Sequence, residues 1–260
     1  VGEIPAAEGG RDVRVQHPHR TAMEHPGSFS APQTPSSRRI DQSRDRLGNT
    51  NGIHQLDGGF RERPVELWHS DVSCDVEPPM GSILRIEQVP TSGGDTLFAS
   101  MYAAYEALSD RMQRLLGELT AVHDGQQYYV GRYGGGNLRD GAYPSAEHPA
   151  VRTHPVTGRL GIYVDEGFTT GFKELKKAES DALLAFVVKH CAAPEFQCRF
   201  RWRPSSVAFW DNRCTQHLAI WDYFPETRHG YRVTIKGDRP FYDAASSAKE
   251  YKATQSRRSP

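Results

Sequence analysis

The chain has 260 residues, with 32 Lys and Arg against 32 Asp and Glu. This length suits one domain with a sizeable core. The balanced charge excludes a net field that would favour nucleic acid or an anionic membrane surface, and no apolar run approaches the roughly 18 residues of a membrane-spanning helix. We therefore expect a soluble, cytoplasmic protein without nucleic-acid or membrane partners. Its four cysteines lack CxxC spacing and are expected to be reduced thiols.

The first part of the chain differs in amino-acid composition from the rest. Residues 1–62 are rich in Arg, Pro, Ser, Gly and Asp, and their composition predicts a loop-rich or disordered segment. Residues 31–51 in particular show neither helical nor strand periodicity. From Arg63 onward, apolar runs of strand length alternate with Gly, Pro and Asp. We predict a folded domain over 63–243 and a polar tail over 244–260.

Within this domain, periodic patterns predict short strands and two sizeable helices. In chain order we expect a strand over 82–89, an amphipathic helix over 101–123, a glycine-rich loop over 131–141, a strand over 160–164, a helix over 178–191 and strands over 196–202, 206–212 and 231–237. Strict alternation in 196–202 places Phe196, Cys198, Phe200 and Trp202 on one face. Short strands with few helices favour a mainly β fold with added helices, of the sandwich or jelly-roll kind.

His69 and Asp71 form the first candidate for a metal site. Two residues apart on an extended segment, they project to the same side and could share a metal ion. The pair is weak by itself, because 11 histidines and 32 acidic residues produce more than one such match by chance. The alternative is that His69 is an ordinary hydrogen-bonded histidine.

A second stretch adds the missing components of such a site. His217 precedes Arg228 and Arg232 by 11 and 15 residues. Two histidines and one carboxylate leave coordination positions open, which suits Fe(II) oxygenases that also bind a 2-oxo acid and O2. The far carboxylate of the oxo acid needs a planar bidentate donor, and arginine provides one. The alternative is that these arginines line a solvated face.

Taken together, these stretches resemble the taurine/2-oxoglutarate dioxygenase family. The resemblance covers about residues 65–242 and is carried by WHSDVS, EPPMGSILRIEQVPTSGGDTLFASMYAAYEALS, HPAVRTHPVTGRLGIYVDEGFTT, PEFQCRFRW and WDNRCTQHLAIWDYFPETRHGYRVTIKGDRPFY. It implies a double-stranded β-helix, the jelly roll, which agrees with the strand pattern. It also implies Fe(II), 2-oxoglutarate and O2 as cofactor and co-substrates, and it leaves a homo-oligomer open.

The same resemblance implies roles for individual residues. His69, Asp71 and His217 would bind iron, Thr96 and Arg228 would bind 2-oxoglutarate, and Arg232 would meet an anionic group of the substrate. Val72 and Phe168 would line the substrate pocket, with core packing as the alternative for both. For Thr96 the alternative is a cap for the following helix. No catalytic group beyond the metal and its ligands is expected.

Two departures from the family pattern bear on the substrate. Cys74 stands where the family has a pocket aromatic, which enlarges the pocket and removes a ring face. Before Arg63 the match is poor, and His54 is the one imidazole close enough to consider, with no role assigned.

The expected reaction is hydroxylation of a small anionic organic substrate, taurine or another alkylsulfonate, with release of sulfite and an aldehyde. Oxidation of alkyl sulfates or aryloxyalkanoates is the alternative within the class. Two alternatives lie outside the dioxygenase class. One is a zinc hydrolase, because two histidines and one aspartate also suit Zn2+. The other is a catalytically dead, ligand-binding relative.

Overall fold

The computed structural model describes residues 53–57, 67–133 and 142–245. All described residues lie within one compact unit, Ile40–Pro260. Its strands are β1 (Ile53–Asp57), β2 (Gly81–Gln88), β3 (Thr96–Ser100), β4 (Thr120–Asp124), β5 (Ser145–Pro149), β6 (Val151–Thr153), β7 (Leu160–Ile162), β8 (Thr169–Phe172), β9 (Gln197–Phe200), β10 (Val207–Asp211), β11 (Thr215–Ala219) and β12 (His229–Ile235). Its helices are α1 (Met101–Glu106), α2 (Asp110–Gly117), α3 (Gly125–Tyr133), α4 (Lys177–Cys191) and the short 3-10 helix η1 (Pro194–Phe196).

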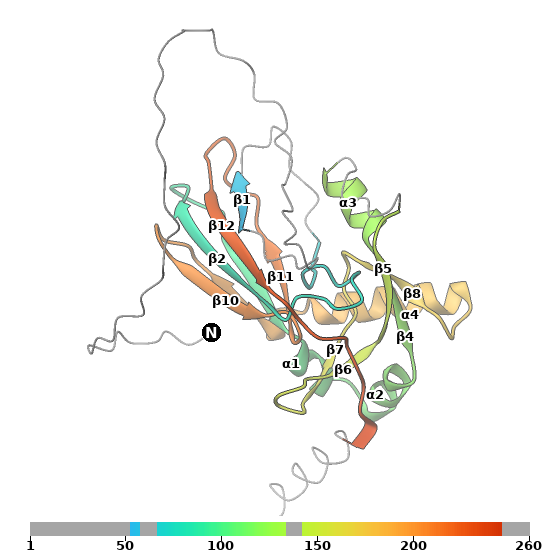
Figure 1. Cartoon of the computed structure of the whole chain (residues 1–260). Helices are drawn as coiled ribbons and strands as arrows, with labels where there is room; N and C mark the ends of the chain where they lie inside the picture. The colour runs from blue at the N-terminus through green and yellow to red at the C-terminus, as the bar shows by residue number, and fades with distance from the viewer. Residues whose placement is uncertain (1–52, 58–66, 134–141, 246–260) are drawn as a thin grey trace, which may run out of the picture. The chain divides into compact units, whose positions relative to one another are not determined.

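The largest sheet has the strand order β1-β12-β2-β10, and these strands lie side by side in Figure 1. Strand β2 explains why one face is buried: Ser82, Leu84 and Ile86 alternate with the more exposed Ile83 and Arg85. This period of two is typical of a strand with one face on the core. The residues that point inward from β2 therefore face the interior in which the candidate site lies.

A second sheet, of order β11-β3-β9, packs against the first. One apolar cluster joins them, with Leu84 and Ile86 from β2, Phe98 from β3 and Trp210 from β10. A larger cluster joins α1, α2 and α4 to β4 and β7. The prediction of a mainly β fold with added helices is confirmed. Within the described ranges, no helix combines the length and the apolar character needed to cross a membrane.

The helix predicted over 101–123 is wrong in its extent. The structure has α1 up to Glu106, a new helix α2 from Asp110 to Gly117, and strand β4 from Thr120. Ser109 ends the continuity, because its side chain accepts the backbone N–H of Met112 and so caps a second helix. The apolar spacing continued across the break because α1, α2 and β4 all pack into the same core cluster.

Other segments differ less from expectation. Strands predicted over 82–89, 160–164, 206–212 and 231–237 and the helix over 178–191 are present with shifted ends. The predicted common buried face of 196–202 is wrong at Cys198, which is exposed on the outermost strand β9. Helix α3 was not predicted, and of the expected glycine-rich loop, residues 134–141 lie outside the described residues.

The N-terminal segment is described only where it joins the large sheet. Strand β1 lies inside the segment 1–62, for which the sequence predicts a loop-rich structure. It pairs antiparallel with β12. His54 lies directly opposite Arg232 in this register. The rest of that segment, including residues 31–51, and the predicted tail from residue 246 lie outside the described residues. The domain boundaries stay a prediction.

Candidate metal centre

Backbone pairing brings the two halves of the predicted site together. His69 and His217 form an isolated antiparallel bridge, with N–H to C=O distances of 3.2 and 2.9 Å in the two directions. Residues directly opposite in an antiparallel pair project to the same face. The two imidazoles therefore lie side by side, with ring centroids 4.3 Å apart, although 148 residues separate them in sequence.

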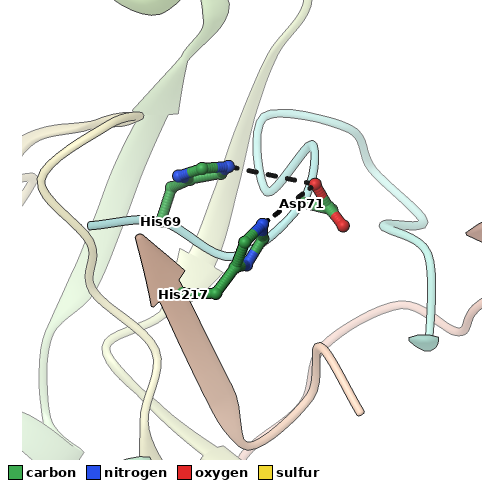
Figure 2. Close-up of side chains that lie close together, drawn as sticks. All are labelled: His69, Asp71 and His217. Carbon is green, nitrogen blue, oxygen red and sulfur yellow. Dashed lines mark ion pairs between the residues drawn. The ribbon is translucent and has the colours of Figure 1, made fainter. Parts of the chain in front are cut away.

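Asp71 completes the group shown in Figure 2. Its Oδ1 lies 3.9 Å from Nε2 of His69 and 3.8 Å from Nε2 of His217. One ligand atom from each of the three residues lies within 4.8 Å of the others, and all three residues are buried. The His-x-Asp spacing and the distant histidine thus converge, as the sequence predicted, on one point.

The protonation of this group fits a metal ion. Nδ1 of His69 lies 2.8 Å from the carbonyl oxygen of Leu67, so Nδ1 carries the proton and Nε2 keeps its lone pair. Burial alone would raise the pKa of Asp71. The neighbouring Arg232, His217 and His69 and a hydrogen bond from Ser82 together hold that pKa below its ordinary value. The carboxylate is therefore a charged acceptor, and the donor set suits a divalent cation.

Thr96 and Arg228 are also brought together. Nη2 of Arg228 donates to Oγ1 of Thr96 at 3.3 Å, and Nε1 of Trp202 donates to the same oxygen at 3.0 Å. Thr96 opens β3, and the helix that follows is capped by Ser100, so the alternative reading of Thr96 as a helix cap is wrong. Arg228 is buried, so the alternative of a solvated face is wrong as well.

The register of β3 and β11 relates this pair to the metal group. His217 lies opposite Phe98, and Ala219 lies opposite Thr96. Thr96 and His217 therefore share one sheet face, about 7 Å apart along the strand at roughly 3.4 Å per residue. A small dicarboxylate could bridge such a distance.

Arg232 lies closer to the metal group than the sequence suggested. It stands opposite Leu84 in the pairing of β12 with β2, hence on the inward face, and its Nη1 donates to Oδ1 of Asp71 at 2.5 Å. Gly230 permits this close pairing, because a Cβ there would collide with the backbone oxygen of Arg85. The guanidinium predicted to meet the substrate thus contacts a predicted metal ligand directly.

Phe168 lies beside His69, and Val72 packs against the same apolar cluster as Phe168. The Phe168 ring is edge-on to His69 at 6.2 Å and packs in a buried cluster with Cys74, Tyr128 and Tyr129, against which Val72 lies. Val72 has a φ of 51°, a left-handed conformation that is rare for a β-branched residue and that marks a constrained loop. Cys74, a member of this cluster, is fully buried.

Several residues at the site were missed by sequence reasoning. Tyr128 places its hydroxyl 3.2 Å from Nε2 of His69, and Ser82 donates to Oδ2 of Asp71 at 2.5 Å. Asp165 is a third: its carboxylate accepts Ser73 Oγ at 2.8 Å and the backbone N–H of Phe168 at 2.7 Å. Burial raises the pKa of Asp165 to about 7. A serine in a strand or an aspartate in a loop carries no distinguishing pattern.

A second group of possible ligands has a structural explanation. His154, Asp211 and Cys214 lie close together. Nδ1 of His154 accepts the backbone N–H groups of Val156 and Thr157, so its Nε2–H donates to Asp211, at 3.0 Å. Arg213 pairs with both oxygens of Asp211 at 2.8 and 2.6 Å. His154 and Asp211 thus use their polar atoms in hydrogen bonds within the protein, and the group is better explained as a hydrogen-bonded corner.

Comparison with known proteins agrees with this geometry. The family model for taurine catabolism dioxygenase TauD, TfdA family, matches residues 17–234, and this match begins well before residue 65, where the resemblance in the sequence motifs starts. An "Alpha-ketoglutarate-dependent sulfonate dioxygenase" of Saccharomyces cerevisiae is 36% identical over 178 residues, which cover 68% of this chain and 43% of that protein. An "Alpha-ketoglutarate-dependent sulfate ester dioxygenase" of Pseudomonas putida is 34% identical over 209 residues, covering 75% of this chain and 67% of that one.

A solved structure shares the fold. The crystal structure of a taurine dioxygenase from Burkholderia xenovorans superposes with a TM-score of 0.62 at 34% identity, covering 75% of this chain and 71% of that one. The predicted double-stranded β-helix is confirmed. This chain spans about half the length of the fungal relatives it matches, 48% for a protein of Schizosaccharomyces pombe and 43% for that of Saccharomyces cerevisiae. The chain belongs to the taurine catabolism dioxygenase TauD, TfdA family.

Proposed function

We propose that this chain acts as an Fe(II)- and 2-oxoglutarate-dependent dioxygenase that hydroxylates a small anionic organic substrate, with taurine or another alkylsulfonate as the preferred class. One observation carries the proposal: His69, Asp71 and His217 offer ligand atoms within 4.8 Å of one another in a buried group. Two histidines and one carboxylate on one side of a metal leave positions for a bidentate oxo acid and for O2.

The protein's own residues would hold and orient the reactants. Bound Fe(II) would supply the coupling of 2-oxoglutarate decarboxylation to substrate oxidation. The hydrogen bond from Nδ1 of His69 to Leu67 holds the tautomer in which Nε2 carries the lone pair that would bind metal. Asp71 contributes a negative charge that offsets part of the charge of the cation. The Tyr128 and Phe168 rings lie 5.0 and 6.2 Å from the His69 ring and would shield this side of the site from water.

Thr96 and Arg228 would bind the far carboxylate of 2-oxoglutarate. A guanidinium matches a carboxylate in a planar, bidentate arrangement, and a neighbouring hydroxyl adds one further donor. The cation–π contact of Arg228 with the Trp202 ring, at 5.4 Å, and the hydrogen bond between Arg228 and Thr96 fix this arginine in the interior.

Arg232 would bind the anionic group of the substrate, and Val72 and Phe168 would line its pocket. Hydroxylation at the carbon that bears a sulfonate gives an adduct whose C–S bond breaks as the hydroxyl loses its proton, yielding an aldehyde and sulfite. Relatives described as sulfonate and sulfate ester dioxygenases support an oxidised sulfur group as the recognised feature. Alkyl sulfates are therefore the first alternative substrates, and aryloxyalkanoates are the second.

The test is succinate release from 2-oxoglutarate under air with Fe(II), across taurine, longer alkylsulfonates, alkyl sulfates and aryloxyalkanoates. We expect an alkylsulfonate to give the largest stimulation, with one sulfite per succinate, and His217→Ala to give none. Stimulation by alkyl sulfates or aryloxy acids alone would move the assignment to that class. Succinate release stimulated by no member of the panel would overturn the substrate proposal.

A further inference from the structure

Arg232 and Asp71 form an ion pair inside the candidate metal group. Nη1 of Arg232 lies 2.5 Å from Oδ1 of Asp71, and the two side chains are 23% and 3% exposed. Oδ1 is also the oxygen that faces Nε2 of His69 and Nε2 of His217, at 3.9 and 3.8 Å. The guanidinium and a metal bound by the two histidines would therefore compete for one carboxylate oxygen.

The other oxygen of Asp71 cannot easily take over either role. Oδ2 accepts the hydroxyl of Ser82 at 2.5 Å, and Ser82 in turn accepts Nδ2 of Asn212 at 3.1 Å. All three residues are buried, and Ser82 is fully so. These two consecutive hydrogen bonds fix the rotation of the Asp71 carboxylate. Oδ1 therefore stays directed at both the histidines and Arg232.

Electrostatics makes this sharing unfavourable for metal binding. A guanidinium within a few ångströms of a divalent cation is repelled by it, and the repulsion is strong in a buried site, where water screens charges poorly. An anion paired with Arg232 would cancel that charge and draw the guanidinium from Oδ1. Sulfonates and sulfate esters have the geometry for such a bidentate pair with arginine.

We propose that Arg232 couples the two binding events, so that a small molecule carrying a sulfonate or sulfate group tightens metal binding and the metal tightens binding of that anion. This inference rests on the proposed function, because it takes His69, Asp71 and His217 as metal ligands. The coupling is reciprocal by thermodynamic necessity and is expected to be on the order of tenfold in each affinity. The enzyme would thus retain its metal best when its anionic substrate is present.

The experiment measures Mn(II) affinity without oxygen or 2-oxoglutarate, by electron paramagnetic resonance of free Mn(II), so that no turnover contributes. The full chain is titrated with and without propane-1-sulfonate. The variants are Arg232→Gln, which removes the charge, Arg232→Lys, which keeps it, and Arg199→Gln, which removes a half-exposed arginine that pairs with the carboxylate of Asp95. Thermal unfolding of each variant verifies that it is folded.

We expect propane-1-sulfonate to tighten Mn(II) binding on the order of tenfold in the unchanged chain and in Arg199→Gln. Arg232→Gln should bind Mn(II) more tightly than the unchanged chain and show no response to the sulfonate, while Arg232→Lys should keep a response. An equal sulfonate effect in Arg232→Gln, or weaker Mn(II) binding by that variant, would overturn the coupling. If Arg232→Gln does not fold, absence of a sulfonate effect in the unchanged chain overturns it equally.

His217→Ala separates this inference from the proposed function. If this variant loses Mn(II) binding while Arg232→Gln behaves like the unchanged chain, the coupling is wrong and the proposed metal site stands. If His217→Ala binds Mn(II) as well as the unchanged chain does, the metal is not held by the proposed residues, and both proposals are overturned.

Discussion

Ser82 donates its hydroxyl to Oδ2 of Asp71 at 2.5 Å, and thereby decides which oxygen of that carboxylate faces the histidines. Ser82 accepts Nδ2 of Asn212, whose Oδ1 accepts Nε1 of Trp210 at 2.8 Å. A series of hydrogen-bonded, buried side chains from β2, from β10 and from Asn212, the residue after β10, thus ends on the candidate metal ligand. Residues that hydrogen-bond a metal ligand in this way orient it, and replacing one typically weakens metal binding about 10- to 100-fold.

Replacing Ser82 with Ala should weaken metal binding about 10- to 100-fold, because Asp71 loses the donor that fixes its rotation. Titration with Mn(II) measures the effect. Ser92→Ala is the matched control, since Ser92 is exposed in the turn before β3. Equal Mn(II) affinity in Ser82→Ala and Ser92→Ala would show that the hydrogen bond does not orient the carboxylate.

Replacing Thr96 with Val should affect both stability and co-substrate binding. The change leaves Nε1 of Trp202 and Nη2 of Arg228 without their shared acceptor, at a cost of about 1–3 kcal/mol for each buried donor. Urea unfolding gives the stability, and the KM for 2-oxoglutarate, which we expect to rise, gives the effect on binding. Thr96→Ser keeps the hydroxyl and should stay close to the unchanged chain in both. A KM unchanged in Thr96→Val would remove Thr96 from the co-substrate site.

Replacing Phe168 with Ala should destabilise the fold by about 3–5 kcal/mol, because a ring that is 1% exposed leaves a cavity among Cys74, Tyr128 and Tyr129. Phe224→Ala is the control, since its ring is 70% exposed, and it should change stability by about 0.5 kcal/mol or less. Chemical denaturation compares the two variants. Similar losses in both would contradict the packing described for Phe168.

His123 should make the stability of the protein depend on pH. Burial first, and then His148, lower the pKa of His123 from 6.5 to about 3, and its Nδ1 lies 3.0 Å from Ser73 Oγ. A pKa lowered by folding means that the folded state binds fewer protons. The contribution of His123 is therefore complete above pH 6.5 and is lost as the pH falls toward 3.

The measurement is the difference in unfolding free energy between the unchanged chain and His123→Gln from pH 7 to pH 4. This difference should shrink by up to about 1.4 kcal/mol per pH unit as the pH falls below 6.5. Asp165 contributes with the opposite sign, because its raised pKa favours the folded state on acidification, and taking the difference reduces that contribution. If the difference in unfolding free energy between the unchanged chain and His123→Gln did not depend on pH, His123 would not be a buried histidine that folding keeps neutral.

The sequence predicted the ligands of the candidate site better than their surroundings. His69, Asp71 and His217 could be found because a fixed spacing and a family pattern identify them, and the bridge between His69 and His217 explains how they meet. Ser82 and Asp165 could not be found, because their contribution depends on which carboxylate or loop lies opposite them in three dimensions. Only tertiary contacts give such residues a role.

The fold shows the same division between local and tertiary information. The alternation in β2 and the apolar spacing of α4 depend on neighbours in sequence, and both elements were predicted to within a residue or so. The segment that became α1, α2 and β4 was predicted as one helix, because its apolar residues keep helical spacing through a capping serine. Pairing of β4 with β5 and β8 decides its last part, and the partners lie more than 20 residues further along the chain.

The most direct test of the proposed chemistry is the metal dependence of 2-oxoglutarate turnover. Succinate formation from 2-oxoglutarate is followed under air for the unchanged chain loaded with Fe(II) or Zn(II), with an alkylsulfonate present, and for His217→Ala with Fe(II). We expect succinate to form with Fe(II) only, and its formation to require oxygen and His217. Product formation with Zn(II) and without 2-oxoglutarate, or equal succinate from His217→Ala, would contradict it.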